Sequence, residues 1–154
     1  MFRELNFSDF KIVVSPGDWM TWFMLNTPTI LLIDDDIDDQ EIFTSALAFI
    51  DNAISCTIAP NGYEGIMQLN DSEALPDLIF LDLNMPVMNG IQFLREVKAA
   101  HKAKDVPVII FSTASDIKTI EEAKQLGAHD FITKPEKFSE LVGLLHGLLF
   151  PATR

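Results

Sequence analysis

From residue 29 onward, the sequence repeats a short apolar run followed by a longer amphipathic stretch, five times in all. The apolar runs are rich in β-branched residues and predict strands at 29–33, 54–58, 78–82, 106–112 and 129–133. The amphipathic stretches predict helices at about 37–50, 61–70, 89–101, 116–126 and 136–149. Strands that alternate with helices form a parallel sheet that is covered on both faces. We therefore predict an α/β domain at residues 29–150, built on a doubly wound five-stranded parallel sheet.

Several predicted helices have recognisable ends. Asn89 and Asp116 are suitable N-cap residues, and Gly127 follows the fourth helix directly. In the last helix, Gly143 and Gly147 each cost about 1 kcal/mol relative to Ala, and we interpret them as loose helix design rather than as a place where another helix approaches. Six apolar residues of that helix repeat at helical spacing and should face the core: Phe138, Leu141, Val142, Leu145, Leu148 and Leu149.

Length and composition limit the class of protein. The chain has 154 residues, of which 48% are hydrophobic, which is enough for one core. A net charge of −12 argues against a nucleic-acid surface, because phosphate binding requires a basic stripe. The single cysteine, Cys56, allows no internal disulfide and indicates a reduced, cytoplasmic setting. No apolar stretch approaches the roughly 20 residues that a membrane-spanning helix requires, so we expect no membrane span.

Residues 1–28 do not belong to the repeat and contain both tryptophans, Trp19 and Trp22. Several interpretations are open. The segment is an extension that docks on the domain or on a partner, a poorly ordered tail, an interfacial membrane anchor, or a stretch that is not translated because synthesis starts at Met24. The sequence does not decide among them, so residues 1–28 are treated as an extension of unknown role and residues 151–154 as a short tail.

Carboxylates crowd the ends of two predicted strands. Asp34 and Asp35 follow the first strand directly, and Asp82 ends the third after four apolar residues. In an open α/β sheet these ends meet at one edge, where ligands bind. Carboxylates held about 5 Å apart repel by about 3 kcal/mol at an effective dielectric near 20, and a cation would remove this cost. The other acids of the run suit the first turn of a helix, where the helix dipole favours them: Asp36, Asp38, Asp39 and Glu41.

Hydroxyl groups and one basic residue follow the last two strands. Ser112, Thr113 and Ser115 follow the fourth strand, and Lys134 follows the fifth. Three carboxylates, a hydroxyl group and an ammonium group at one edge would suit Mg²⁺, which prefers oxygen ligands and keeps several waters. Asp82 could then act as a nucleophile toward phosphorus, with Thr113 and Lys134 holding the phosphoryl oxygens.

These strand-end residues belong to motifs that occur in a fixed order along the chain. The motifs are an acidic pair, Asp34 and Asp35; an aspartate motif, Asp82 with Met85, Pro86 and Gly90; a hydroxyl position, Thr113 followed by Ala114; and a lysine, Lys134, followed by Pro135. In this order and on these strands, they resemble the receiver domain of two-component response regulators. The resemblance covers residues 29 to about 150 without a gap. It implies a flavodoxin-like sheet with the strand order 2-1-3-4-5.

The resemblance also assigns roles to the site residues. It implies that Asp82 accepts a phosphoryl group from a phosphohistidine of a sensor histidine kinase or a histidine phosphotransfer protein. Asp35, Asp82 and the backbone carbonyl of Asn84 would bind Mg²⁺, and Asp34 would act nearby through water. The domain would catalyse its own phosphorylation and hydrolysis and would not be an enzyme for any other substrate.

Further family features concern the response to phosphorylation. Thr113 would move inward, and Phe131 would fill the space that it leaves. The helix of the fourth repeat, with the strand and helix of the fifth, would form the output or homodimer surface, which includes Ile117, Ile120 and Lys124. The Lys134–Pro135 peptide bond is expected to be cis. Residues 84 and 115 occupy the positions that tune phosphoryl lifetime in the family.

Only residues 151–154 follow the last predicted helix, which suggests a stand-alone receiver that acts on a downstream protein by contact or through a phosphorelay. The main alternative is a receiver fold that binds partners without phosphorylation, although such a module would not need Asp82 or Lys134. Other classes agree less well. The acidic run would repel the phosphate of a flavin nucleotide, and Asn84 cannot replace the second acid of a haloacid dehalogenase-type phosphatase.

Overall fold

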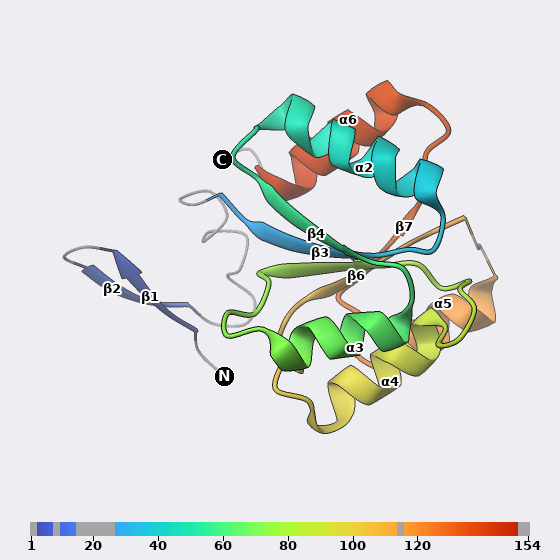
Figure 1. The fold of residues 1–154 in the computed structure, drawn as a ribbon, viewed down its shortest axis with the longest axis horizontal. Coiled ribbons are helices and arrows are strands. Elements are labelled where there is room, and N and C mark those ends of the chain that lie inside the picture. The colour runs from blue at the N-terminus through green and yellow to red at the C-terminus, as the bar shows by residue number, and fades with distance from the viewer. Residues whose placement is uncertain (1–2, 8–9, 15–26, 114–115, 151–154) are drawn as a thin grey trace.

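The computed structural model describes residues 3–7, 10–14, 27–113 and 116–150 (Figure 1). Trp19, Trp22, Ala114, Ser115 and the tail 151–154 lie outside the described residues, so the predictions for these positions are not tested.

A five-stranded sheet forms the centre of the domain. Its strands are β3 (Thr29–Ile33), β4 (Ser55–Ala59), β5 (Leu78–Leu81), β6 (Val108–Ser112) and β7 (Asp130–Thr133). The order across the sheet is β4-β3-β5-β6-β7, and every neighbouring pair is parallel. Counted within the domain, this is the predicted order 2-1-3-4-5. The carboxyl ends of all five strands therefore lie at one edge.

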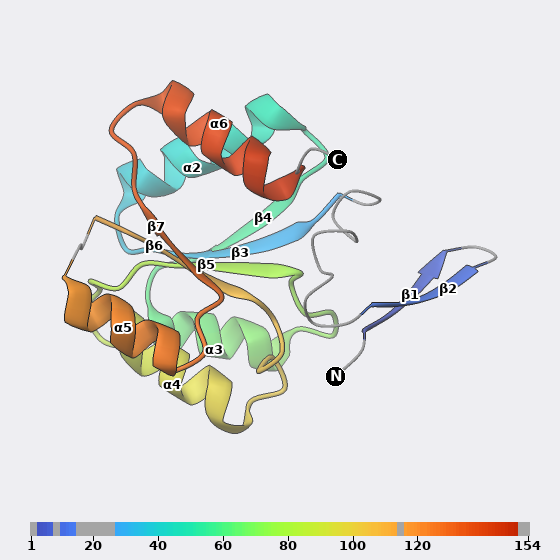
Figure 2. The same ribbon diagram turned by 180° about the vertical axis from the view of Figure 1, so that it is seen from behind.

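Five helices cover the two faces of the sheet. They are α2 (Ile37–Ile50), α3 (Gly62–Asp71), α4 (Gly90–Ala100), α5 (Ile117–Gln125) and α6 (Phe138–Leu149). Helices α2 and α6 lie on one face, and α3, α4 and α5 lie on the other (Figures 1 and 2). The predicted strands and helices are all present, and none of their bounds differs from the observed one by more than two residues.

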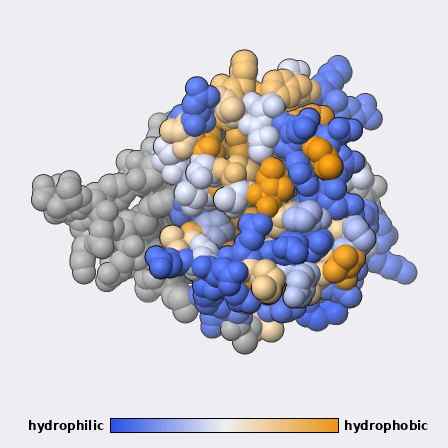
Figure 3. All heavy atoms as spheres, viewed as in Figure 1, coloured by the Kyte–Doolittle hydropathy of each residue, from blue (hydrophilic) through white to orange (hydrophobic). Residues whose placement is uncertain are grey.

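Alternating side chains of the strands form two cores, one on each face of the sheet. Ile30 and Leu32 of β3 pack in the core beneath α2 and α6, whereas Leu31 and Ile33 pack in the core beneath α3, α4 and α5. The central strand β5 is buried along its whole length, as expected for a parallel strand covered on both faces. Outside these cores, hydrophilic side chains cover much of the face seen in Figure 3, with apolar side chains between them.

The helix ends follow the predicted signals closely. The Asn89 side chain accepts a hydrogen bond from the Gln92 backbone and completes a capping box at the start of α4. The Asp116 side chain accepts one from the Thr119 backbone at the start of α5. Gly127, which follows the C-cap residue Leu126 of α5, has a positive φ of 103°, the conformation that ends many helices.

One core prediction for α6 is wrong. Phe138 is 44% exposed because it is the first residue of the helix, where it contacts the exposed ring of Phe49 instead of the core. The other five predicted positions of α6 are buried or partly buried against the core that also contains α2. A Cβ atom built on Gly143 or Gly147 would meet nothing within 4 Å, so neither glycine permits a close approach.

A hairpin that the sequence analysis did not predict precedes the domain. Strands β1 (Arg3–Phe7) and β2 (Phe10–Val14) pair antiparallel and form a separate two-stranded sheet. Among the described residues, no helix combines the length and the apolar character needed to cross a bilayer.

Candidate functional site

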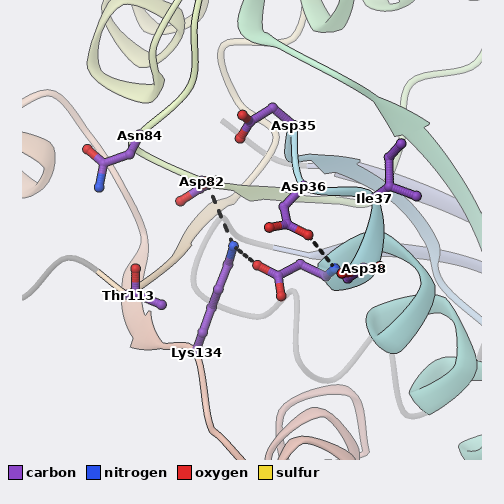
Figure 4. A pocket seen from close by; sticks show the side chains of 9 residues that line it. Asp35, Asp36, Ile37, Asp38, Asp82, Asn84, Thr113 and Lys134 are labelled. Atoms are coloured by element: carbon purple, nitrogen blue, oxygen red, sulfur yellow. Dashed lines mark hydrogen bonds and ion pairs between the residues drawn. The ribbon is translucent and has the colours of Figure 1, made fainter.

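All of the predicted site residues except Asp34 line a pocket of about 530 Å³ at the carboxyl edge of the sheet, and Asp34 bonds Lys134 of that pocket. Lys134 extends from the end of β7 toward the carboxylates that follow β3 and β5 (Figure 4). The pocket is lined by Asp35, Asp36, Ile37, Asp38, Asp39, Asp82, Asn84, Thr113 and Lys134.

Asp34 is the most deeply buried acid of the site, with 1% of its surface exposed. Its backbone N–H donates to the Ala59 carbonyl, which extends the pairing of β3 with β4 by one residue. Its Oδ1 accepts a hydrogen bond of 3.0 Å from the Asp36 N–H. Burial raises the pKa of Asp34, although the hydrogen bond from Lys134 acts in the opposite direction.

Asp82 is also buried, directly after β5. Its backbone N–H donates to the Ile33 carbonyl at 2.9 Å, which places it beside Asp34 at the end of the neighbouring strand. Burial raises its pKa, and the charge of Lys134 and a hydrogen bond with the Ser112 side chain oppose this effect. Lys134 and Ser112 therefore offset only part of the cost of burying the negative charge of Asp82.

Lys134 is the cation of the site, and 10% of its side chain is exposed. Its Nζ lies 2.6 Å from Asp34 Oδ2, 2.8 Å from Asp39 Oδ2 and 3.7 Å from Asp82 Oδ2. Burial lowers the pKa of Lys134, but the hydrogen bonds to Asp34 and Asp39 and the charges of Asp34 and Asp82 outweigh this effect and hold the pKa above its usual value. Lys134 is therefore charged at neutral pH.

Three carboxylates of the site could hold a metal ion together. Asp34, Asp35 and Asp82 each offer an oxygen atom, and these atoms lie within 4.8 Å of one another. Asp34 and Asp82 are buried, whereas Asp35 is exposed at the mouth of the pocket. Asn84 lines the same pocket. A set of oxygen ligands with one open side suits a hard divalent cation that keeps some of its waters.

Asp39 is the site residue that the sequence analysis missed. It was assigned to the favourable charges at the start of a helix, and it does lie in the first turn of α2. Its carboxylate nevertheless accepts a hydrogen bond from the ammonium group of Lys134, which lies 95 positions away in the sequence. Helical side chains point back toward the helix N-terminus, so an acid in the first turn after Asp34 and Asp35 can reach the same pocket. That geometry is the signal that could have identified it.

The remaining predicted residues are placed as follows. Thr113 is exposed and lines the pocket, whereas Phe131 is partly buried against the core that also contains α4. The expected cis bond between Lys134 and Pro135 is wrong, because this bond is trans. The trans form is the default for a bond before proline by about 0.5–1 kcal/mol, and with this bond trans the Lys134 N–H still donates to the Ser112 carbonyl.

Comparison with known proteins agrees with this geometry. The family model of the response regulator receiver domain matches residues 30–146. The chain is 34% identical over 113 residues to the probable C4-dicarboxylate response regulator DctR of Priestia megaterium, a match that covers 73% of this chain and 48% of the relative. The chain thus spans about half the length of that relative.

Solved structures show the same relationship. The phosphorylated cyanobacterial phytochrome response regulator RcpA aligns with a TM-score of 0.72 and 29% identity, over 83% of this chain and 98% of RcpA. The chemotaxis response regulator CheY4 of Vibrio cholerae aligns with a TM-score of 0.67 and 26% identity, over 80% of this chain and 99% of CheY4. The chain belongs to the response regulator receiver domain family.

Proposed function

We propose that this chain is a phosphorylation-dependent switch whose phosphoacceptor is Asp82. One observation carries the proposal: the buried carboxylate of Asp82 lies beside Asp34 and Asp35 and 3.7 Å from the ammonium group of Lys134. The structural similarity to RcpA, which is 29% identical and was solved in a phosphorylated form, supports this assignment. Receiver domains act with histidine kinases and downstream targets, so the phosphodonor would be a phosphohistidine on a sensor kinase or a phosphotransfer protein.

The transfer forms one bond to phosphorus and breaks another. An oxygen of the Asp82 carboxylate attacks the phosphorus atom, and the P–N bond to the donor imidazole breaks. The imidazole leaves with the electron pair of that bond, and Asp82 becomes an acyl phosphate. Lys134 Nζ and the Thr113 hydroxyl would donate hydrogen bonds to the phosphoryl oxygens, because phosphoryl transfer depends mainly on positioning and charge stabilisation.

The oxygen ligands of the pocket are suited to Mg²⁺. Asp35, Asp82 and the Asn84 carbonyl would hold the ion, with Asp34 acting through a water molecule. The ion would supply positive charge that offsets the repulsion among the carboxylates and the phosphoryl group. This role agrees with the spacing of the three carboxylates, whose oxygen atoms lie within 4.8 Å of one another.

The cycle would end by hydrolysis. Water attacks the phosphorus atom, the P–O bond to Asp82 breaks, and inorganic phosphate leaves. The domain would thus act on no substrate other than its own phosphoryl group.

The signal would leave the domain through protein contacts or a phosphorelay. The family's output and dimer surface corresponds here to α5, β7 and α6, and it includes Ile117, which is 70% exposed. Ile120 is partly buried and Lys124 is exposed on the same helix. This surface is available for a downstream protein or for a second copy of the chain.

Direct phosphorylation tests the proposal. The purified protein is incubated with Mg²⁺ and phosphoramidate, a small donor with the same P–N bond, and its intact mass is measured. We expect one added phosphoryl group on the parent, none on Asp82→Asn, and none on the parent after chelation of Mg²⁺. Glu73→Gln, which alters an exposed acid in the loop before β5, should label like the parent. A folded, metal-loaded parent that stays unlabelled would contradict the proposal and favour a phosphorylation-independent interaction module.

A further inference from the structure

The three carboxylates around Lys134 hold its ammonium group unequally. An ammonium group has three protons to donate. Asp34 and Asp39 accept hydrogen bonds of 2.6 and 2.8 Å, whereas Asp82 Oδ2 lies at 3.7 Å, beyond hydrogen-bond distance. The phosphoacceptor therefore has the weakest of the three contacts with the group that would stabilise its phosphoryl oxygens.

Asp39 differs from the other acids in its position. It does not belong to the cluster of Asp34, Asp35 and Asp82 that could hold a metal ion. It lies in the first turn of α2, and its side chain is 36% exposed, so it contributes little to the packing of the core. Asp39 therefore contacts Lys134 from outside the set of carboxylates that could hold a metal ion.

We infer that Asp39 competes with the phosphoryl group on Asp82 for the ammonium group of Lys134, and so weakens phosphoryl binding and shortens the phosphoryl lifetime. The inference rests on the proposed function of Asp82. Two effects act in the same direction. The carboxylate of Asp39 draws the ammonium group toward α2, and its negative charge adds to the repulsion that a phosphoryl dianion meets in this pocket. Asp39 is a positioning residue in this scheme, because it acts through Lys134.

The variant Asp39→Asn tests the inference, because it keeps the shape of the side chain and removes its charge. Asp38→Asn is the matched control. Asp38 lies in the same turn, is exposed and lines the same pocket, so its replacement makes the same change in net charge. Asp39→Glu retains a carboxylate that can reach Lys134 and should behave like the parent.

Two measurements report on the phosphoryl group. Fluorine NMR gives the affinity for beryllofluoride, a mimic of the phosphoryl group, and a time course of intact masses gives the rate of hydrolysis after the donor is removed. We expect Asp39→Asn to bind beryllofluoride about fivefold more tightly than Asp38→Asn and to lose its phosphoryl group about fivefold more slowly. A factor of about five is the effect expected from the loss of one partly exposed ion pair.

A third measurement needs no phosphoryl group. The side-chain nitrogen NMR signal of Lys134, assigned by its loss in Lys134→Arg, should shift in Asp39→Asn and stay in place in Asp38→Asn. Equal behaviour of Asp39→Asn and Asp38→Asn in beryllofluoride binding and hydrolysis would overturn the inference while leaving the proposed function intact. A parent protein that neither binds beryllofluoride nor accepts a phosphoryl group would instead overturn the proposed function, and the inference with it.

Discussion

Lys134 Nζ lies 2.6 Å from Asp34 Oδ2, although the two residues are 100 positions apart in the sequence. The two residues meet because each directly follows a parallel strand of one sheet, and these strands end at the same edge. Both side chains are largely buried, so neither charge is well compensated by water.

Replacement of Lys134 by Met should destabilise the protein in the absence of metal ions. The methionine retains most of the apolar volume, but Asp34 and Asp82 lose the positive charge between them. We expect the free energy of unfolding at about pH 7 to fall by about 2–4 kcal/mol, as for a buried ion pair that loses one partner. Urea denaturation measures this value, and Lys124→Met, on the exposed face of α5, is the control. An unchanged midpoint for Lys134→Met would show that the ion pair does not stabilise the fold.

Replacement of Asp82 by Asn should stabilise the metal-free protein at neutral pH. Burial raises the pKa of Asp82 above its usual value of 3.8, so the folded protein holds this proton more tightly than the unfolded chain does. The raised pKa therefore contributes fully to the free energy of unfolding at a pH below the usual pKa of Asp82. This contribution is lost as the pH rises through the higher pKa of the folded state. An asparagine at this position does not ionise and so avoids this loss, and we expect the variant to be about 1 kcal/mol more stable than the parent at about pH 7.

The pH dependence provides the check on this prediction. The difference between Asp82→Asn and the parent should shrink as the pH falls toward the usual pKa of 3.8. A difference that grows on acidification would mean that the neighbours of Asp82 stabilise its ionised form and that its pKa is not raised by folding.

Replacement of Asp35 by Asn should weaken metal binding with little effect on the fold. Asp35 is exposed, so loss of its charge should change the stability of the metal-free protein by less than about 0.5 kcal/mol. It is also one of three carboxylates in the cluster, and its loss should lower the affinity for Mg²⁺ by about tenfold or more. Isothermal titration calorimetry measures this affinity, with Asp38→Asn as the control for charge. Equal affinities in the two variants would argue against Asp35 as a ligand.

Much of this architecture was predictable from sequence because the signals are local. The apolar run of β5 and the acid that follows it placed Asp82 at the end of a buried strand, and the same logic placed Asp34 and Lys134. The contact between Asp39 and Lys134 was not predictable in this way, because it depends on where α2 begins relative to β7. The exposure of Phe138 likewise depends on the exact first residue of α6, which periodicity does not define to better than a few residues.

The loop after Asp82 contains a residue under backbone strain. Val87 has a φ of 70°, at the centre of a tight turn in which the Met88 N–H donates to the Pro86 carbonyl. A β-branched residue is unfavourable in this conformation, and Val87 is 81% exposed, so it gains little from packing. Val87→Gly should raise the free energy of unfolding by about 1 kcal/mol. Urea denaturation measures the change. Val87→Ala keeps the Cβ atom, so its free energy of unfolding should rise by less than that of Val87→Gly. A loss of stability in Val87→Gly would show that the exposed side chain contributes more than the strain costs.

Gly90, at the start of α4, should tolerate no larger residue. A Cβ atom built there would lie 2.8 Å from the Leu83 Cα and would also overlap the carbonyl oxygen of Asp82. Because these are backbone atoms of the segment that carries Asp82, Gly90→Ala should force that segment to shift and should cost about 1–3 kcal/mol. Gly143→Ala is the control, because it makes the same substitution at an exposed position of α6 where a Cβ atom meets nothing within 4 Å. That variant should be more stable than the parent by about 0.5–1 kcal/mol. Thermal and urea unfolding of both variants measure these changes, and a stable Gly90→Ala that is phosphorylated normally would show that the loop after β5 can adjust without loss of function.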